Sequence, residues 1–161
     1  MTIHNIPPVY DKNSRILILG SFPSVKSREA EFFYGHPQNR FWRVLASIVG
    51  VETPSSTEEK REFLLSHGIA VWDVIASCEI EGSADSTIRS VQPNDLSVIL
   101  SSADIRAIFV NGRTSEKYYN KFVKEAIGRE AILLPSTSPA NAAVSLDALI
   151  EAWGVIKEYI L

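Results

Sequence analysis

The chain reads RILILGSFPS from residue 15 to residue 24. Apart from Arg15, the first five residues are continuously apolar, which is typical of a strand buried on both faces of a parallel sheet. A second run, HPQNRFW at residues 36–42, leads into a helical pattern. The residues between them therefore form a long structured loop at the carboxyl edge of a sheet, where open α/β sheets bind their ligands.

The rest of the chain predicts the same sheet. Further nearly continuous apolar runs, each short enough for a buried strand, occur at residues 69–75, 107–112 and 131–136. Helical patterns lie between them, one with an apolar face over residues 41–49 and one opened by a capping box of Ser56 and Glu59. This alternation predicts an α/β fold, a three-layer α/β/α sandwich around a central four-stranded parallel sheet.

Residues 76–92 are polar and contain GSADS at residues 82–86. They make a longer connection than is usual after a strand, so we expect a functional loop there. With the loops after the first and fourth predicted strands, it would converge on one edge of the sheet. Asn111, Gly112 and Arg113, after the third strand, add a smaller fourth loop.

Length and composition indicate one domain. The chain has 161 residues, 45% of them hydrophobic, and a formal net charge of −3, so it lacks the positive field of a general nucleic-acid binder. The single cysteine, Cys78, cannot form an internal disulfide and suggests no zinc site. No signal peptide and no membrane-length apolar run is recognisable, so we expect a cytoplasmic protein with no membrane partner.

Several common site motifs are missing. The sequence has no phosphate-binding loop, no dinucleotide fingerprint, no serine nucleophile elbow and no zinc-protease motif. The candidate loops instead carry amide, hydroxyl and aromatic side chains. These groups suit a planar, uncharged heterocycle held by stacking and recognised by hydrogen bonds.

Three segments resemble motifs of the uracil-DNA glycosylase superfamily. They are GSFPS at residues 20–24, HPQNRFW at 36–42 and LPSTSPAN at 134–141, and the most similar branch is that of the hypoxanthine-DNA, or DNA-deoxyinosine, glycosylases. The resemblance covers residues 1–161 as a single domain. It implies a monomer that flips deaminated bases, chiefly hypoxanthine, out of DNA and hydrolyses their N-glycosidic bond in base excision repair. It also implies that neither a metal nor another cofactor is needed. Lys26 is the only lysine close to the predicted pocket and nothing near it in sequence suggests desolvation, so we expect an enzyme that does not cut the strand.

The resemblance assigns catalysis to Asn39, with Gln38 in a supporting role. Mismatch-specific relatives read Gly-Ile-Asn-Pro-Gly in the first motif, and their Asn positions the water. This chain has Phe22 there, so that chemistry cannot come from this position. Asn39 is also an excellent N-cap for the following helix, and the two roles do not exclude each other.

The same resemblance predicts a base pocket and a DNA-contacting surface. Phe32 is the first choice for stacking on the base, although Phe33 or Tyr34 could replace it and a loop aromatic can simply fill the core. The predicted pocket residues are Ser21, Phe22, Pro23, Phe32, Phe33, His36 and Asn111. The predicted DNA contacts are Ser24, Lys26, Arg40, Arg113, Ser136, Thr137, Ser138, Pro139 and Asn141.

These assignments have simpler alternatives. His36 can make structural hydrogen bonds, Asn111 and the Ser-Pro residues are typical of turns, and basic side chains are usually solvated. Two alternative functions also remain open. One is a uracil or mismatch-specific glycosylase on the same scaffold, and the other is a noncatalytic nucleotide-binding module of flavodoxin-like build.

Overall fold

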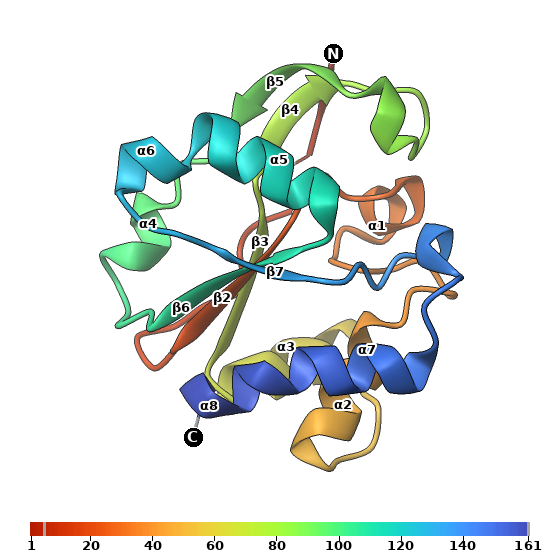
Figure 1. The fold of residues 1–161 in the computed structure, drawn as a ribbon, viewed down its shortest axis with the longest axis vertical. Helices are drawn as coiled ribbons and strands as arrows, with labels where there is room; N and C mark the ends of the chain where they lie inside the picture. Colours follow the sequence, from red (N-terminus) through yellow and green to blue (C-terminus); the bar gives the residue numbers. More distant parts are fainter. Residues whose placement is uncertain (5, 161) are drawn as a thin grey trace.

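The computed structural model describes residues 1–4 and 6–160, and its centre is a parallel sheet (Figure 1). Within these residues the sheet has four strands in the order β3-β2-β6-β7, all parallel. The strands are β2 (Ile16–Gly20), β3 (Ile69–Asp73), β6 (Ala107–Asn111) and β7 (Ile132–Leu134). Each lies inside one of the predicted apolar runs, so the predicted sheet is confirmed.

Helices cover both faces of the sheet (Figure 1). Ile16 and Ile18 of β2 belong to one apolar core, whereas Leu17 and Leu19 belong to the other, as expected for a strand buried on both sides. One face carries α2 (Phe41–Val49), α3 (Thr57–Ser66), α7 (Leu146–Trp153) and α8 (Lys157–Ile160), with a 3₁₀ turn at Gly154–Ile156 before α8. The other carries α4 (Ser97–Leu100), α5 (Arg113–Phe122) and α6 (Lys124–Ile127).

The predicted capping box opens α3 only in part. The Ser56 hydroxyl accepts a hydrogen bond from the Glu59 backbone N–H at 3.1 Å, as the pattern predicts. The Glu59 carboxylate does not return to the Ser56 backbone but accepts from the Ser55 hydroxyl at 3.3 Å.

The prediction of one long loop at residues 76–92 is wrong. Within the described residues, β4 (Ile75–Glu79) and β5 (Arg89–Pro93) pair antiparallel, and β1 (Thr2–Ile3) joins them in a sheet of order β1-β4-β5. Only Val74 separates β3 from β4, and the predicted apolar run at residues 69–75 covers β3 and no more than the first residue of β4. Most of β5 is exposed, so it carries no apolar pattern. The loop itself spans residues 80–88 and includes a 3₁₀ turn at Asp85–Thr87.

Two short elements complete the architecture around the carboxyl edge of the parallel sheet. They are α1 (Val25–Ala30), after β2, and a 3₁₀ turn at Pro139–Asn141, after β7. Parallel strands end at the same edge, so the segments after β2, β3, β6 and β7 meet there. Across residues 1–4 and 6–160, no helix combines the length and apolar character needed to span a bilayer.

Candidate active site

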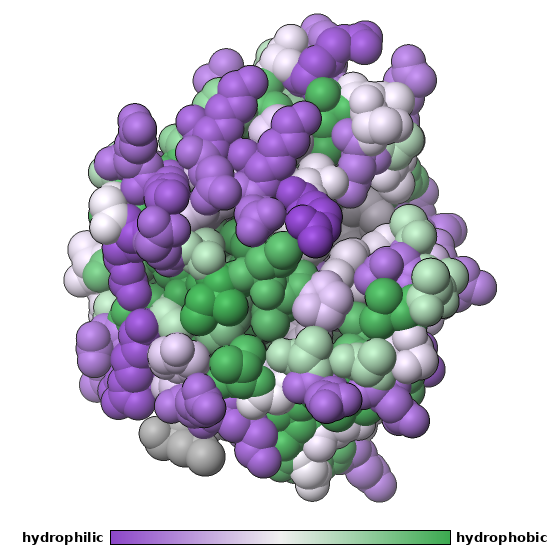
Figure 2. Space-filling view, in the orientation of Figure 1, coloured by the Kyte–Doolittle hydropathy of each residue, from purple (hydrophilic) through white to green (hydrophobic). Residues whose placement is uncertain are grey.

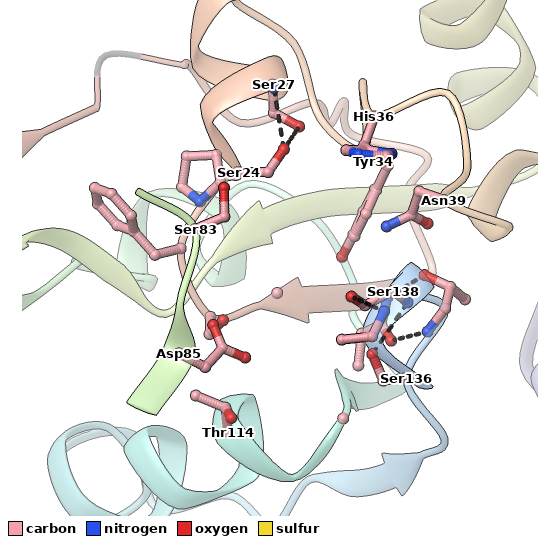
Figure 3. A pocket seen from close by; sticks show the side chains of 18 of the residues that line it. Ser24, Ser27, Tyr34, His36, Asn39, Ser83, Asp85, Thr114, Ser136 and Ser138 are labelled. Atoms are coloured by element: carbon pink, nitrogen blue, oxygen red, sulfur yellow. Dashed lines mark hydrogen bonds between the residues drawn. The ribbon is translucent and has the colours of Figure 1, made fainter. Parts of the chain in front are cut away.

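A cavity of about 460 Å³ lies at the carboxyl edge of the parallel sheet (Figure 3). One side, which we call the fixed wall, consists of residues 36–42 and 134–144. The opposite side, the loop wall, consists of residues 80–88. The floor is formed where β2, β3 and β6 end, and the residues there include Gly20, Asp73 and Asn111.

Asn39 is held in one orientation on the fixed wall. Its side-chain Oδ1 accepts a hydrogen bond from the Phe41 backbone N–H at 3.0 Å, at the start of α2. Arg40 occupies the N-cap position itself and makes no side-chain capping bond, so Asn39 performs that task from one residue earlier. With Oδ1 occupied, Nδ2 points into the cavity (Figure 3). Capping thus orients the amide that the sequence singled out.

Arg40 is used differently from its predicted role as a DNA contact. Its guanidinium donates to the carbonyl of Asn141 at 3.0 Å and to that of Val144, and its backbone N–H donates to the Thr137 carbonyl at 3.1 Å. Loop carbonyls that lack a ladder partner need such donors. Arg40 therefore clamps the two segments of the fixed wall together, and it is not among the residues that line the cavity.

Thr137 and Asn111 form a second cross-link. Asn111 Nδ2 donates to the Thr137 hydroxyl at 3.0 Å, and the Thr137 backbone N–H donates to Asn111 Oδ1 at 3.1 Å. Thr137 has 0% exposure, so its predicted contact with DNA is not available in this structure. Gly112 has a φ of 95° and a Cβ there would lie 3.0 Å from the Ser136 Cβ, so glycine permits this close approach.

The aromatic rings that line the cavity do not include Phe32, which the sequence made the first choice for stacking on the base. Phe32 is 4% exposed and packs parallel to Trp42 in the core, with ring centroids 6.1 Å apart, and it does not line the cavity. Phe22, Phe33 and Tyr34 do line it. Tyr34 has a φ of 51°, rare for an aromatic residue, and its ring stacks on Phe41 at 3.9 Å. This reversal turns the hydroxyl of Tyr34 into the site (Figure 3).

The remaining predicted residues divide between the cavity and the surface. Gln38 is exposed and lies outside the lining, as does Lys26, which pairs with Glu29 at 3.8 Å. Asn141 also lies outside it and donates from Nδ2 to the Ser136 carbonyl at 2.9 Å. The predicted residues that line the cavity are Ser21, Phe22, Pro23, Ser24, Phe33, His36, Asn39, Asn111, Arg113, Ser136, Thr137, Ser138 and Pro139.

Two of these lining side chains also have local structural tasks. The Ser24 hydroxyl caps α1 by accepting from the Ser27 backbone N–H at 3.1 Å. His36 Nδ1 accepts from the Gln38 backbone N–H at 3.1 Å, which leaves Nε2 available on a half-buried ring.

Asp73 is the cavity residue that sequence reasoning missed. It ends β3, is 3% exposed, and its Oδ2 has no hydrogen-bond partner among the described residues. Burial raises the pKa of this carboxyl to about 7. The buried Tyr34 hydroxyl nearby also has no such partner, and burial together with Asp73 raises its pKa. An acidic residue closing an otherwise apolar strand run, IAVWD, was the available signal.

The loop wall adds polar groups opposite Asn39. Ser83, Asp85 and the α5 residue Thr114 reach the cavity there (Figure 3). Partial burial raises the pKa of Asp85, and a hydrogen bond to Thr114 lowers it. The amino end of α5 also faces the cavity and favours negative charge through its helix dipole. Among the described residues, no three histidine, cysteine, aspartate or glutamate side chains gather as a metal site.

An open parallel sheet with an amide, hydroxyls and aromatic rings around a cavity at its carboxyl edge is an arrangement that suits a flat heterocycle. The chain belongs to the uracil DNA glycosylase superfamily, whose family match covers residues 7–156.

Individual relatives are similar over almost their whole length. The chain is 37% identical to a protein named hypoxanthine DNA glycosylase from Methanosarcina barkeri, over 95% of this chain and 96% of the relative. It is also 37% identical to a protein of the same name from Methanosarcina acetivorans, over 90% and 92%. A solution structure of a putative uracil DNA glycosylase from M. acetivorans superposes with a TM-score of 0.83 at 33% identity, covering 98% of this chain and 97% of that one.

Proposed function

We propose that this chain is a monofunctional DNA-deoxyinosine glycosylase, which hydrolyses the N-glycosidic bond of hypoxanthine flipped out of DNA. The observation that carries the proposal is the fixed Asn39 amide, which faces a cavity closed on the same side by the Ser136–Ser138 loop. Two relatives that align over nearly the whole chain are named for hypoxanthine. DNA containing deaminated bases is then the partner, and we expect the enzyme to act as a cytoplasmic monomer.

The cavity suits a base taken out of the duplex. Extruding a nucleotide costs roughly a few kcal/mol, which contacts inside the pocket must offset. The rings of Phe22 and Tyr34 supply apolar and aromatic surface for the base. For the DNA backbone, Ser136 and Ser138 of the fixed wall offer hydroxyls, and Arg113 at the start of α5 offers a guanidinium.

The chemistry requires positioning more than a strong base. Glycosidic bond cleavage passes through a sugar with oxocarbenium character, while negative charge collects on the departing base. An amide is a poor general base but can hold and orient the attacking water, and this is the task we assign to Asn39. No lysine is among the described residues that line the cavity, which supports hydrolysis without a Schiff base.

The test replaces Asn39 and measures single-turnover base release from duplexes containing deoxyinosine. Asn39→Asp keeps an acceptor for the Phe41 N–H, so stability should persist, because Asp caps about as well as Asn. Base release should fall by at least about a hundredfold, because the amide NH₂ is lost. Gln38→Ala, which removes an exposed neighbouring amide, is the matched control and should change release less than about threefold.

Two outcomes would replace the proposal. Unchanged release by Asn39→Asp would remove the catalytic assignment, and no release by the unaltered chain would favour a noncatalytic nucleotide-binding module. Parallel duplexes containing deoxyuridine and deoxyxanthosine determine the substrate. Release of uracil alone would identify a uracil glycosylase instead.

A further inference from the structure

Asp73 occupies the centre of the cavity floor. A Cβ on Gly20 would lie 2.5 Å from Asp73 Oδ1 and 3.1 Å from the Tyr34 hydroxyl, so both polar groups converge on this glycine. Asp73 is 3% exposed and lines the cavity. Its Oδ2 has no hydrogen-bond partner in the described chain and lies on the His4 side, so Oδ1, the oxygen next to Gly20, is the one that can meet a ligand. A buried carboxyl without a partner costs free energy, and this cost calls for a functional explanation.

The surroundings keep this carboxyl protonated below about pH 7, because burial raises its pKa to about that value. His4 Nε2 lies 3.8 Å from Asp73 Oδ2, but it donates to the Ile75 carbonyl at the shorter distance of 2.9 Å. His4 Nδ1 accepts from the Ile6 backbone N–H at 3.4 Å, which fixes the neutral tautomer. Burial lowers the pKa of His4, and the Arg28 charge lowers it further. Below about pH 7 the two groups are therefore neutral neighbours and do not form an ion pair.

Other titratable groups around the floor do not change this assignment. The Tyr34 hydroxyl is uncharged at neutral pH, because burial and Asp73 raise its pKa. The Arg28 guanidinium is directed elsewhere, to the Gly82 carbonyl at 2.7 Å and over the Phe22 ring at 5.4 Å. Asp85 lies across the cavity on the loop wall, and in its ionised form it disfavours ionisation of a second carboxyl.

We propose that the neutral Asp73 carboxyl is a catalytic residue that donates a hydrogen bond to the flipped base as the base leaves the sugar. This inference rests on the proposed function. When the C1′–N bond breaks, its electron pair stays on the base and the water oxygen bonds to C1′. The water proton ends on the base through solvent, so Asp73 keeps its own. A carboxylate here would repel the departing anion, whereas a carboxylic acid stabilises it.

The test is a pH profile of single-turnover hypoxanthine release, from about pH 5.5 to about pH 9, for the unaltered chain and for variants. Release by the unaltered chain should be level below about pH 7 and fall about tenfold per unit above it, as Asp73 ionises. Asp73→Asn should give a level profile, because its amide keeps a donor at every pH. Asp73→Ala should be at least about tenfold slower at pH 6, because no donor remains.

Asp85→Asn is the matched control, since it neutralises the other carboxyl of the same cavity. It should retain the fall above neutral pH. An Asp73→Asn profile that falls like that of the unaltered chain would overturn the inference, and so would an Asp85→Asn profile that is level. These results are distinct from failure of the proposed function, in which the unaltered chain releases no hypoxanthine at any pH. If Asp73→Ala does not fold, the pH profile of Asp73→Asn still tests the inference.

Discussion

The two walls of the cavity are built differently. On the fixed wall, Arg40 makes hydrogen bonds to three loop carbonyls, and Asn111 exchanges two hydrogen bonds with Thr137. The loop wall is tied to α1 by the Val25 N–H, which donates to the Ser83 hydroxyl at 2.9 Å, and by Arg28. Residues 81–86 are otherwise exposed.

This difference matches the work that each side would do. A catalytic amide must stay within a fraction of an ångström of its productive position, and the cross-links of the fixed wall provide that. A surface that receives a DNA backbone benefits from adjustment, and loops with few buried contacts are the first to open. Figure 2 shows hydrophobic residues gathered in the middle of the visible face, with hydrophilic residues around them.

The largest effect is expected from breaking the fixed wall at Arg40. Arg40→Ala removes the side-chain donor of the Val144 carbonyl and one of the two donors of the Asn141 carbonyl, which also accepts from the Val144 N–H at 3.2 Å. The free energy of unfolding should fall by about 2 kcal/mol. Base release should fall at least about tenfold, because the Asn39 side of the site loses its support. Urea denaturation and single-turnover kinetics measure both. Full activity in a destabilised variant would show that the wall need not be fixed.

Asp73, on the floor between the walls, offers a second test, because its ionisation makes the free energy of unfolding depend on pH. The folded pKa of Asp73, about 7, lies above the unfolded value of 3.8, so the folded state binds the proton more tightly. Stability from this group is complete below the unfolded pKa and is lost as pH rises towards 7. Between about pH 5 and pH 7 the unaltered chain should lose about 2 kcal/mol relative to Asp73→Asn. Equal pH slopes in urea denaturation would show that the carboxyl is hydrated.

A gentler change on the fixed wall is Thr137→Val, which keeps the shape and removes the hydroxyl. Asn111 Nδ2 then loses its acceptor, although the Thr137 N–H still donates to Oδ1. The free energy of unfolding should fall by about 1 kcal/mol, with a loss of activity of about threefold. Thermal unfolding and base release report the two effects. A neutral result would mean that the backbone bond alone holds the wall.

The smallest effect is expected on the loop wall. Ser83→Ala removes the acceptor of an exposed N–H that water can satisfy, so stability should change by less than about 0.5 kcal/mol. Catalysis on saturating DNA should be within about twofold of normal. If Ser83→Ala lowered stability and base release as much as Arg40→Ala, in urea denaturation and single-turnover kinetics, the two walls would be equally rigid.

The sequence predicted the parallel sheet because strands buried on both faces must be continuously apolar. It did not predict β5, whose residues are mostly exposed. Asn39 was found because its motif is long, whereas the single Asp73 has no motif around it. Which aromatic ring lines the cavity depends on the backbone around it, where Glu31 and Tyr34 both have positive φ, and the residue types do not reveal such conformations. Arg40 donates equally well to phosphate and to carbonyls, so only the folded loop decides between them.

The pairing of β1 with β4 places the first residues of the chain behind the chemistry. His4 is 8% exposed, and its Nε2 lies 3.8 Å from Oδ2 of Asp73. Removal or bulky chemical modification of residues 1–4 should therefore expose Asp73 to water on its His4 side and lower its pKa towards that of a surface aspartate. The two-residue strand β1 would in this way help to set the pH range in which Asp73 keeps its proton.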